Sequence, residues 1–325
     1  MKLLLKALAA LAVLLVLVGG SGYLWASGRS ATLLARTIDA HAVDFPIPFP
    51  LSDAEIAELQ LTPDGADALA RERAAERGRH LVEARYGCVD CHGADFGGAT
   101  MMDSPPMGLF QGPNLTLGQG GATADYGPAD WDRIVRHGLR PDGTPAVMPS
   151  QDFARMSDKE LSDIVSFIRT LPPVDRTMEP VRFGPLGKFL LASGKLPLPA
   201  DGIPSHDQPH GAEPPETAVT LEFGEHLAAT CTGCHGPRLT GGPIVGGDPS
   251  WVPAANLTPA ADGLRGWTRE DFHRLAREGV RPDGSAVQAP MTFALPATQR
   301  MTDTEVDALW MYLASLEPLP TGTRD

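Results

Sequence analysis

The hydrophobic residues of this chain are most concentrated in one stretch close to the N-terminus. Lys2 and Lys6 form a basic start, and residues 7–28 then carry no charged side chain. As a helix this stretch would extend about 33 Å, enough to cross the hydrocarbon core of a bilayer. Lysines before such a segment favour a cytoplasmic N-terminus and export of the residues after the segment. We interpret residues 1–28 as a transmembrane anchor, with a cleaved signal peptide as the alternative, because Ala-Ser-Gly at 26–28 fits a cleavage site.

Beyond this stretch, apolar residues recur at helical spacing in two separate parts of the chain. The first part contains predicted helices over residues 71–86, 129–137 and 158–171, and the second over residues 269–278 and 303–316. Loops rich in glycine and proline separate them, and we find no apolar–polar alternation long enough for a strand. The pattern predicts an all-α fold.

Two proline-rich segments interrupt the helical pattern. Residues 29–70 include Phe-Pro-Ile-Pro-Phe-Pro at 45–50, where the prolines favour extended backbone and exclude helix. In the same segment Ser52 and Glu55 have the spacing of a capping box, which predicts a short helix. Residues 176–217 carry too much proline and glycine for a core of their own. We interpret both segments as linkers, the second as an ordered strap or linker.

All four cysteines of the chain lie in two copies of the motif Cys-x-x-Cys-His. The copies are Cys88-Val-Asp-Cys91-His92 and Cys231-Thr-Gly-Cys234-His235. The motif is typical of c-type haem attachment, in which the cysteines form thioether bonds and the histidine binds the iron. A zinc ribbon would place its cysteine pairs about 15–20 residues apart and a thioredoxin-like dithiol needs a βαβ context, and neither condition is met. The sequence therefore predicts two covalently bound haem c groups.

The two motifs lie inside an internal repeat whose offset drifts only from 141 to 146 residues. Each copy has Gly-x-His-Leu before the motif, then Asn-Leu-Thr, then Arg-Pro-Asp-Gly, and finally a methionine and an aspartate at the start of the last predicted helix. Two copies with so long a period indicate two tandem domains rather than a solenoid. We place the first domain at residues 71–175 and the second at residues 218–320. A covalent haem would add a large apolar body to each small core.

Each copy resembles a class I cytochrome c domain, and the whole chain resembles membrane-anchored bacterial dihaem cytochromes c. In this family the first and last helices of a domain cross where a glycine meets an aromatic residue. Gly78 with Phe167, and Gly224 with Tyr312, occupy the matching positions. The resemblance therefore implies two small helical domains, each folded around one haem.

The resemblance also implies how each iron is held. The family orients the haem-binding histidine through a loop carbonyl, often from proline; Pro113 fits this pattern, and Ala255 in the second copy departs from it but still offers a carbonyl. Electron-carrying members supply the opposite ligand from a methionine before the last helix. Met148 matches that position, whereas the second loop is shifted by two residues. There we assign Met291, with Met301 as the alternative, although packing is the simpler role for Met301.

Three further histidines are interpreted as structural residues. His80 and His226 lie on the first helix of each copy, well before the haem motif, so we expect a packing or surface role. His137 has Glu278 as its counterpart in the second copy. A haem with two histidine ligands is therefore only weakly supported.

Charge and ligand chemistry limit the class of function. The 325 residues carry a net charge of −13, which argues against nucleic acid and favours a basic patch on a redox protein as partner. Histidine and methionine together leave no coordination position for substrate and raise the reduction potential. We predict a non-enzymatic electron carrier on the inner membrane, with its haem domains on the periplasmic side. Redox proteins such as a membrane dehydrogenase or a terminal oxidase are the expected partners.

Two other functions remain open at this point. A dihaem enzyme of the peroxidase or thiosulfate-oxidising type would keep one iron open or ligate it without methionine, and the shifted Met291 loop is the one feature in its favour. A haem sensor is disfavoured because no signalling domain accompanies the haem motifs. Ligation of the second iron distinguishes the carrier from the enzyme.

Overall fold

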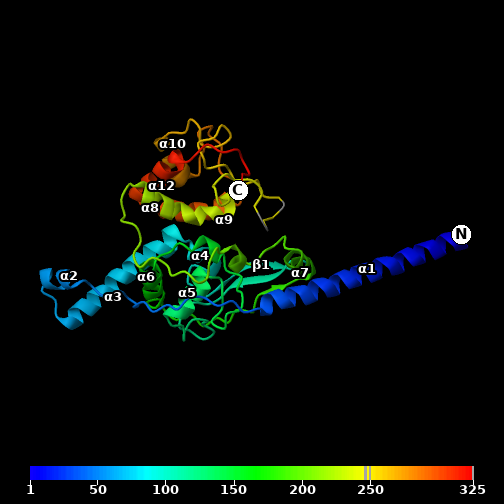
Figure 1. The fold of residues 1–325 in the computed structure, drawn as a ribbon, viewed down its shortest axis with the longest axis horizontal. Coiled ribbons are helices and arrows are strands. Elements are labelled where there is room, and N and C mark those ends of the chain that lie inside the picture. The colour runs from blue at the N-terminus through cyan, green and yellow to red at the C-terminus, as the bar shows by residue number, and fades with distance from the viewer. Residues whose placement is uncertain (245–246, 249, 324–325) are drawn as a thin grey trace.

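Two helical bodies lie against each other, and a long N-terminal helix projects from the first of them (Figure 1). This computed structural model describes residues 1–244, 247–248 and 250–323. The described residues are mostly helical, as predicted, with one small sheet in the first body. The polypeptide between the two bodies runs over the first one before it enters the second.

The predicted helices are present in the predicted order, but the helix predicted over residues 71–86 begins at Pro63 and ends in a π-helix, and the helices Pro185–Ala192 and Met291–Arg300 were not predicted. The N-terminal helix is α1 (Lys2–Ala35). The first body contains α2 (Asp53–Glu58), α3 (Pro63–His80), the π-helix η1 (Leu81–Arg85), α4 (Cys88–His92), α5 (Pro128–Arg136), η2 (Ser150–Asp152) and α6 (Asp158–Ile168). The connecting segment contributes α7 (Pro185–Ala192) and η3 (Pro199–Gly202). The second body contains α8 (Leu221–Ala228), η4 (Ala229–Cys231), α9 (Thr232–His235), α10 (Arg269–Glu278), α11 (Met291–Arg300) and α12 (Asp303–Ser315).

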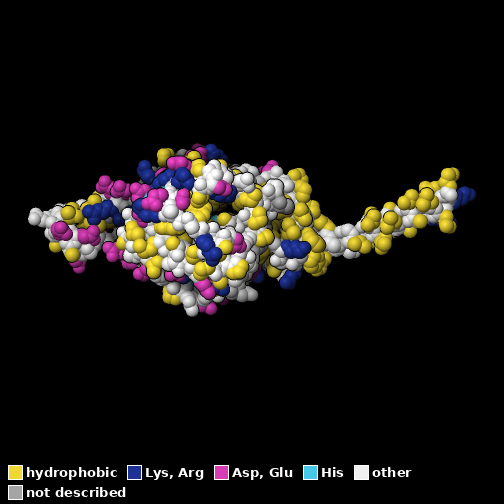
Figure 2. Space-filling model, turned by 90° about the horizontal axis from the view of Figure 1, so that it is seen from above, with side chains coloured by type: hydrophobic (Ala, Val, Ile, Leu, Met, Phe, Trp, Pro, Cys, Tyr) yellow, Lys and Arg dark blue, Asp and Glu magenta, His cyan; other side chains and the backbone are white. Residues whose placement is uncertain are grey.

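The helix α1 is long and apolar enough to cross a membrane, with a mean hydropathy of 2.5 in its most apolar window. Its hydrophobic side chains surround the projecting part of the helix (Figure 2). The end of α1 packs on α7, where the Trp25 and Phe189 rings meet edge to face at 6.2 Å. Ser30 Oγ donates a hydrogen bond of 2.9 Å to the Lys188 carbonyl. The helix therefore continues past residue 28 and joins the body through α7.

The first and last helices of each body cross at a glycine, as the resemblance implied. On α3, a Cβ atom at Gly78 would overlap the carbonyl of Asp163 and the Cβ of Phe167 on α6. On α8, a Cβ atom at Gly224 would overlap the backbone of α12 and the Cβ of Tyr312. Because no side chain intervenes, the helix backbones approach closely, and the crossing fixes where each haem motif begins.

Replacing Gly78 by alanine should destabilise the first body. Alanine gains about 1 kcal/mol in helix propensity over glycine, but here the overlap with α6 forces the helices apart, and overpacking costs about 1–3 kcal/mol. We expect a net loss that is measurable as a lower urea midpoint. Gly202→Ala is the control, because its Cβ would make only ordinary contacts beginning at 3.5 Å. Equal midpoints for the two variants would contradict the close crossing.

The small sheet corrects the prediction that the chain lacks strands. It has the antiparallel order β1 (Ala99–Ser104), β2 (Gly108–Gly112) and β3 (Arg182–Phe183). Strand β1 is exposed and its register shifts between Thr100 and Met102, so its sequence shows no regular alternation of apolar and polar residues. Strand β3 lies in the predicted strap and pairs with β2. The connecting segment is thus attached to the first body through backbone hydrogen bonds.

Each body has a hydrophobic core of its own. Trp131, Leu161 and Val165 are among the buried residues of the first core, and Phe223 and Leu313 are among those of the second. The N-terminal proline-rich segment is part of the first core, because Phe45 is buried there and the carbonyl of Pro46 accepts a hydrogen bond of 2.7 Å from Ser162 Oγ on α6. The segment predicted as a linker therefore packs on the domain that comes after it.

Candidate haem-binding sites

The first Cys-x-x-Cys-His motif forms the short helix α4, directly after η1. His92 is buried, and its Nδ1 lies 2.9 Å from the carbonyl oxygen of Pro113. Since a carbonyl only accepts, Nδ1 carries the proton and Nε2 keeps the lone pair that an iron requires. Burial lowers the pKa of His92, although the bond to Pro113 opposes this. The ring is therefore held neutral and oriented as a ligand.

The second motif repeats this geometry at α9. His235 Nδ1 lies 2.7 Å from the carbonyl oxygen of Ala255, so alanine provides the carbonyl that proline provides in the first copy. Burial also lowers the pKa of His235. The sequence prediction that Ala255 can take over this role is confirmed.

The cysteine environments favour thioether attachment over the alternatives. Burial raises the pKa of Cys88 to about 12 and that of Cys231 to about 11. The pKa values of Cys91 and Cys234 are raised as well, again mainly by burial. Redox-active dithiols and zinc sites depend on thiolates, which electropositive surroundings stabilise. Cys234 is exposed and the other three cysteines are half-buried, and no cationic side chain is among the causes of the four raised pKa values, which disfavours both alternatives.

The Asn-Leu-Thr repeats hold the loops that carry the two carbonyls. Asn114 Oδ1 accepts hydrogen bonds from the backbone N–H of Thr116 at 2.9 Å and from its Oγ1 at 2.8 Å. Asn256 and Thr258 make the same pair of bonds at the same distances. In each copy the amide Nδ2 then donates at 2.7 Å to a carbonyl in the segment after the last helix. Each loop, and with it the histidine, is tied to the C-terminal helix of its domain.

The four methionines of the ligand assignment separate into two classes. Met156 and Met301 are buried at the starts of α6 and α12 and belong to the two cores, which agrees with a packing role. Met148 is half-buried in the loop between α5 and η2 and contacts the first core. Met291 is half-buried as well, but it is the first residue of α11. The two candidate ligands therefore differ in their local backbone.

A buried donor in the first domain fits an acceptor from a haem. Trp131 is 3% exposed, and its Nε1 has no hydrogen-bond partner among the described residues. A buried N–H without an acceptor costs about 1–3 kcal/mol. A haem propionate is an acceptor of the kind that this N–H requires. Together with the orientation of the two histidines, this supports haem as the group that the domain holds.

The candidate ligand segment of each domain packs on the haem-binding region of the other. The turn η2, shortly after Met148, contacts η4 and α9, which contain the second motif. There the carboxylate of Asp152 lies against the Cα of Gly233, and burial raises the pKa of Asp152 to about 7. In turn α11, which begins with Met291, packs on η1, just before the first motif. The two sites therefore share one interdomain interface.

A buried ion-pair network, which sequence reasoning missed, crosses this interface. His80 Nε2 lies 2.9 Å from Glu305 of the second domain, and His226 Nε2 lies 2.9 Å from Glu160 of the first. Arg85 pairs with both carboxylates. The two histidines are thus structural, as expected, but their partners are across the interface. The repeat contained a signal for this network, because His80 and His226 occupy equivalent positions, and Glu160 and Glu305 complete equivalent capping boxes at the starts of α6 and α12.

Comparison with known proteins identifies the family. The family model for cytochrome c matches residues 75–172 and 222–317, together more than half of the chain. The chain belongs to the cytochrome c family. Membership of this family supports covalent haem c as its cofactor, as predicted from the two motifs.

Relatives of this cytochrome c are found in several bacteria. It is 30% identical over 81% of its length to the cytochrome c subunit of a quinone alcohol dehydrogenase from Gluconacetobacter polyoxogenes, and covers 59% of that protein. It is 27% identical over 74% of its length to a dihaem cytochrome c-type protein from Cereibacter sphaeroides, and covers 84% of it. It is 29% identical over 77% of its length to the cytochrome c subunit of a gluconate 2-dehydrogenase from Pantoea cypripedii, and covers 61%. The chain thus spans about six tenths of the dehydrogenase subunits that it matches.

Proposed function

We propose that this cytochrome c is a membrane-tethered dihaem electron carrier that serves a membrane dehydrogenase. The observation that carries the proposal is the pair of haem motifs, each with its histidine oriented by a carbonyl, in domains that pack on each other's motif. Haem c, when bound, supplies one-electron redox chemistry. The relatives that are cytochrome subunits of dehydrogenases support the assignment of the partner.

The side chains of the two domains would bind the groups and keep substrate away from them. Cys88, Cys91, Cys231 and Cys234 would form the thioether bonds. His92 and His235 would each direct Nε2 to an iron, and Met148 and Met291 would each supply a second protein ligand. With two protein ligands on each iron, the chain would carry electrons and would not turn over a substrate. We assign residues 71–175 to the first haem domain and residues 218–320 to the second.

The shared interface would give electrons a short route through the chain. The turn η2, shortly after Met148, contacts the second motif, and α11, which begins with Met291, packs on η1 just before the first motif. A carrier with this arrangement accepts an electron at one domain and delivers it from the other without a third protein between them. The acidic net charge of −13 favours docking of this carrier on basic surfaces of its partners.

The anchor would hold this carrier at the membrane surface. In α1 the basic residues precede the apolar stretch, which favours a cytoplasmic N-terminus and haem domains on the periplasmic side of the inner membrane. The exposed side chains of Leu186 and Phe189 on α7 lie beside the end of α1 and extend its apolar surface to the body. A dehydrogenase in the same membrane is then the donor within reach, and a terminal oxidase is a candidate acceptor.

Haem content and carbon monoxide binding test this proposal. The purified full chain should contain two covalent haems, and the double variant Cys231→Ser with Cys234→Ser should contain one. The reduced protein should show no carbon monoxide difference spectrum, because both irons keep two protein ligands. One haem per wild-type chain would contradict the dihaem assignment. Carbon monoxide binding to the wild type would instead favour the enzyme with an open iron.

A further inference from the structure

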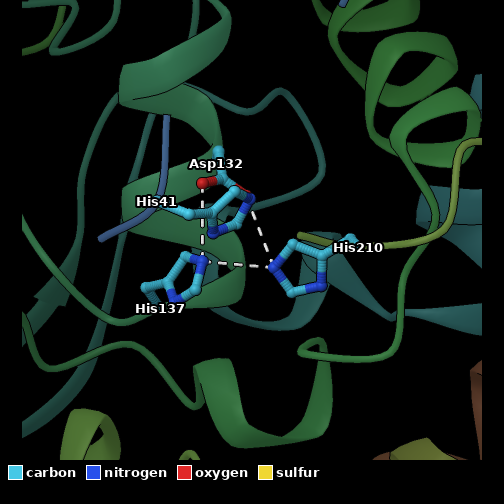
Figure 3. Close-up of side chains that lie close together, drawn as sticks. All are labelled: His41, Asp132, His137 and His210. Carbon is cyan, nitrogen blue, oxygen red and sulfur yellow. Dashed lines mark hydrogen bonds and ion pairs between the residues drawn. The ribbon is translucent and has the colours of Figure 1, made fainter. Parts of the chain in front are cut away.

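A second cluster of metal-ligand side chains lies in the first domain, apart from both haem motifs. It consists of His41, Asp132, His137 and His210, and one ligand atom from each lies within 4.8 Å of the others. Figure 3 shows the His137 and His210 rings and the Asp132 carboxylate turned toward one another, with His41 beside them. These residues come from three separate parts of the chain. His41 lies between α1 and α2, Asp132 and His137 lie at α5, and His210 lies in the interdomain strap.

The distances among three of the four residues are close to those around a tetrahedral ion. His137 Nε2 lies 3.1 Å from His210 Nε2 and 3.4 Å from Asp132 Oδ2. His210 Nε2 lies 3.6 Å from Asp132 Oδ1. Four ligands at the usual zinc bond lengths of about 2.0–2.1 Å would be about 3.3 Å apart in tetrahedral geometry. His137, His210 and Asp132 lie close to this spacing, and His41, which lies within 4.8 Å of them, would move inward to complete the coordination.

The carboxylate of this cluster is incompletely satisfied. Asp132 is fully buried, and its Oδ2 has no hydrogen-bond partner among the described residues, although His137 Nε2 lies 3.4 Å away. A buried charged oxygen without a hydrogen bond is costly, and bound cations are one of the usual ways in which this cost is met. Its other oxygen, Oδ1, accepts a 2.7 Å hydrogen bond from Arg136 Nε, and Arg136 also pairs with Asp158 at 2.8 Å. With two carboxylates around one guanidinium, the site keeps a net negative charge.

The hydrogen bonds behind His137 place its proton on Nδ1, away from the cluster. His137 Nδ1 lies 3.0 Å from His206 Nδ1, and His206 Nε2 lies 3.2 Å from the carbonyl of Ala200. Since the carbonyl only accepts, His206 carries its proton on Nε2, and its Nδ1 accepts the proton of His137 Nδ1. His137 Nε2 then presents a lone pair to the cluster. This is the arrangement in which an outer partner orients a metal-binding histidine.

We propose that His41, Asp132, His137 and His210 bind one divalent ion of the zinc class, distinct from the haem irons. Three imidazoles and one carboxylate suit zinc, copper and nickel, whereas calcium and magnesium prefer oxygen ligands alone. The bound ion cross-links the N-terminal segment, α5 and the strap. It thereby fixes the position at which the chain leaves α1 and the course of the strap toward the second domain.

Zinc binding to the haem-loaded full chain tests the site. The protein is purified without a polyhistidine tag, treated with EDTA, dialysed, and titrated with zinc chloride by calorimetry, while elemental analysis counts zinc and iron separately. We expect one zinc per chain, and an affinity that is at least about 100-fold weaker in His210→Ala, which loses a direct ligand. His41→Ala should weaken binding too. His210 and His41 are only half-buried, so their variants should fold where His137→Ala fails.

His273→Ala is the matched control, because His273 also pairs with a carboxylate, 2.7 Å from Asp307, but belongs to no metal-ligand cluster among the described residues. This variant should bind zinc as the wild type does. Zinc should also slow amide exchange in residues 38–44 and 204–212 of the wild type, and should not do so in His210→Ala. Absence of zinc binding to the wild type, or equal binding by His210→Ala, would overturn the proposal. Stoichiometric binding that leaves exchange in both segments unchanged would place the ion elsewhere and would overturn it as well.

Discussion

Met148→Leu should convert one haem of this cytochrome c into a carbon monoxide-binding site. Leucine fills a volume similar to that of methionine, so the packing cost should stay below about 1.5 kcal/mol. It has no sulfur to offer the iron, and one coordination position opens. The reduced variant should then bind one carbon monoxide per chain, as seen in its difference spectrum. The potential of that haem should fall by on the order of 0.1 V, a fraction of the about 0.8 V over which axial ligands set haem potentials.

The methionines at the starts of the last helices provide the controls. Met156 and Met301 occupy repeat positions in the two cores, where leucine should preserve the packing. Met156→Leu and Met301→Leu should therefore bind no carbon monoxide. Met291→Leu should behave like Met148→Leu, with the other haem affected. If Met301→Leu opens the second iron and Met291→Leu does not, the assignment in the second domain is wrong.

The second domain also decides between carrier and enzyme. Met291 begins the helix α11, whereas Met148 lies in an irregular loop. If the wild type already binds carbon monoxide and Met291→Leu leaves that binding unchanged, the second iron is open without this residue. The chain would then belong with dihaem enzymes. Unchanged six-coordinate spectra in the wild type, together with a new site in Met291→Leu, support the carrier.

Local sequence was sufficient to predict most of the helices and the proximal side of each site. The predicted helix over residues 269–278 is α10, and those over 158–171 and 303–316 begin where α6 and α12 begin. Each is signalled by a cap and by helical spacing of its apolar residues, which depend on neighbours within a few positions. Ala255 was assigned correctly because a backbone carbonyl is independent of the side chain.

The features that sequence did not predict depend on residues distant along the chain. Strand β3 is two residues long and pairs with β2 across some seventy positions, so no local alternation marks it. The four residues of the proposed zinc site are spread from His41 to His210, and they approach only because the two linkers pack on the first domain. Similarly, the partner of His80 is Glu305 in the other domain. Local patterns carry no information about such pairings until the domains are docked.

Glu305→Gln should destabilise the packing of the two domains on each other by about 3 kcal/mol near neutral pH. The side chain of Glu305 is 1% exposed, and it accepts hydrogen bonds from His80 and Arg85 of the first domain. Burial alone would raise its pKa, but the bond from His80 and the charge of Arg85 prevail and lower the pKa from 4.5 to about 2. A shift of this size corresponds to about 3 kcal/mol. Removing one partner of a buried ion pair typically costs about 3–5 kcal/mol.

The direction of the pKa shift of Glu305 predicts how the stability of the fold depends on pH. Because the pKa of Glu305 is lower in the folded than in the unfolded chain, its carboxylate stabilises the fold fully above about pH 4.5. That stabilisation is lost as the pH falls from about 4.5 to about 2. Glu305→Gln lacks the titrating group, so its stability should fall less steeply across the same window. Urea unfolding of both proteins between pH 7 and pH 2, followed by Soret circular dichroism, measures the difference.

A second interdomain ion pair separates the effect of burial from that of charge. Arg155 of the first domain pairs with Glu225 of the second at 3.0 Å, but their side chains are 60% and 47% exposed. Exposed pairs contribute about 0–1 kcal/mol, so Glu225→Gln should leave the urea midpoint almost unchanged. In Glu305→Gln, by contrast, Arg85 stays between the domains with Glu160 as its remaining carboxylate, and the domains should unfold in separate steps. Equal losses in the two variants would show that the buried network does not hold the domains together, and the proposed route for electrons across this interface would lose its structural support.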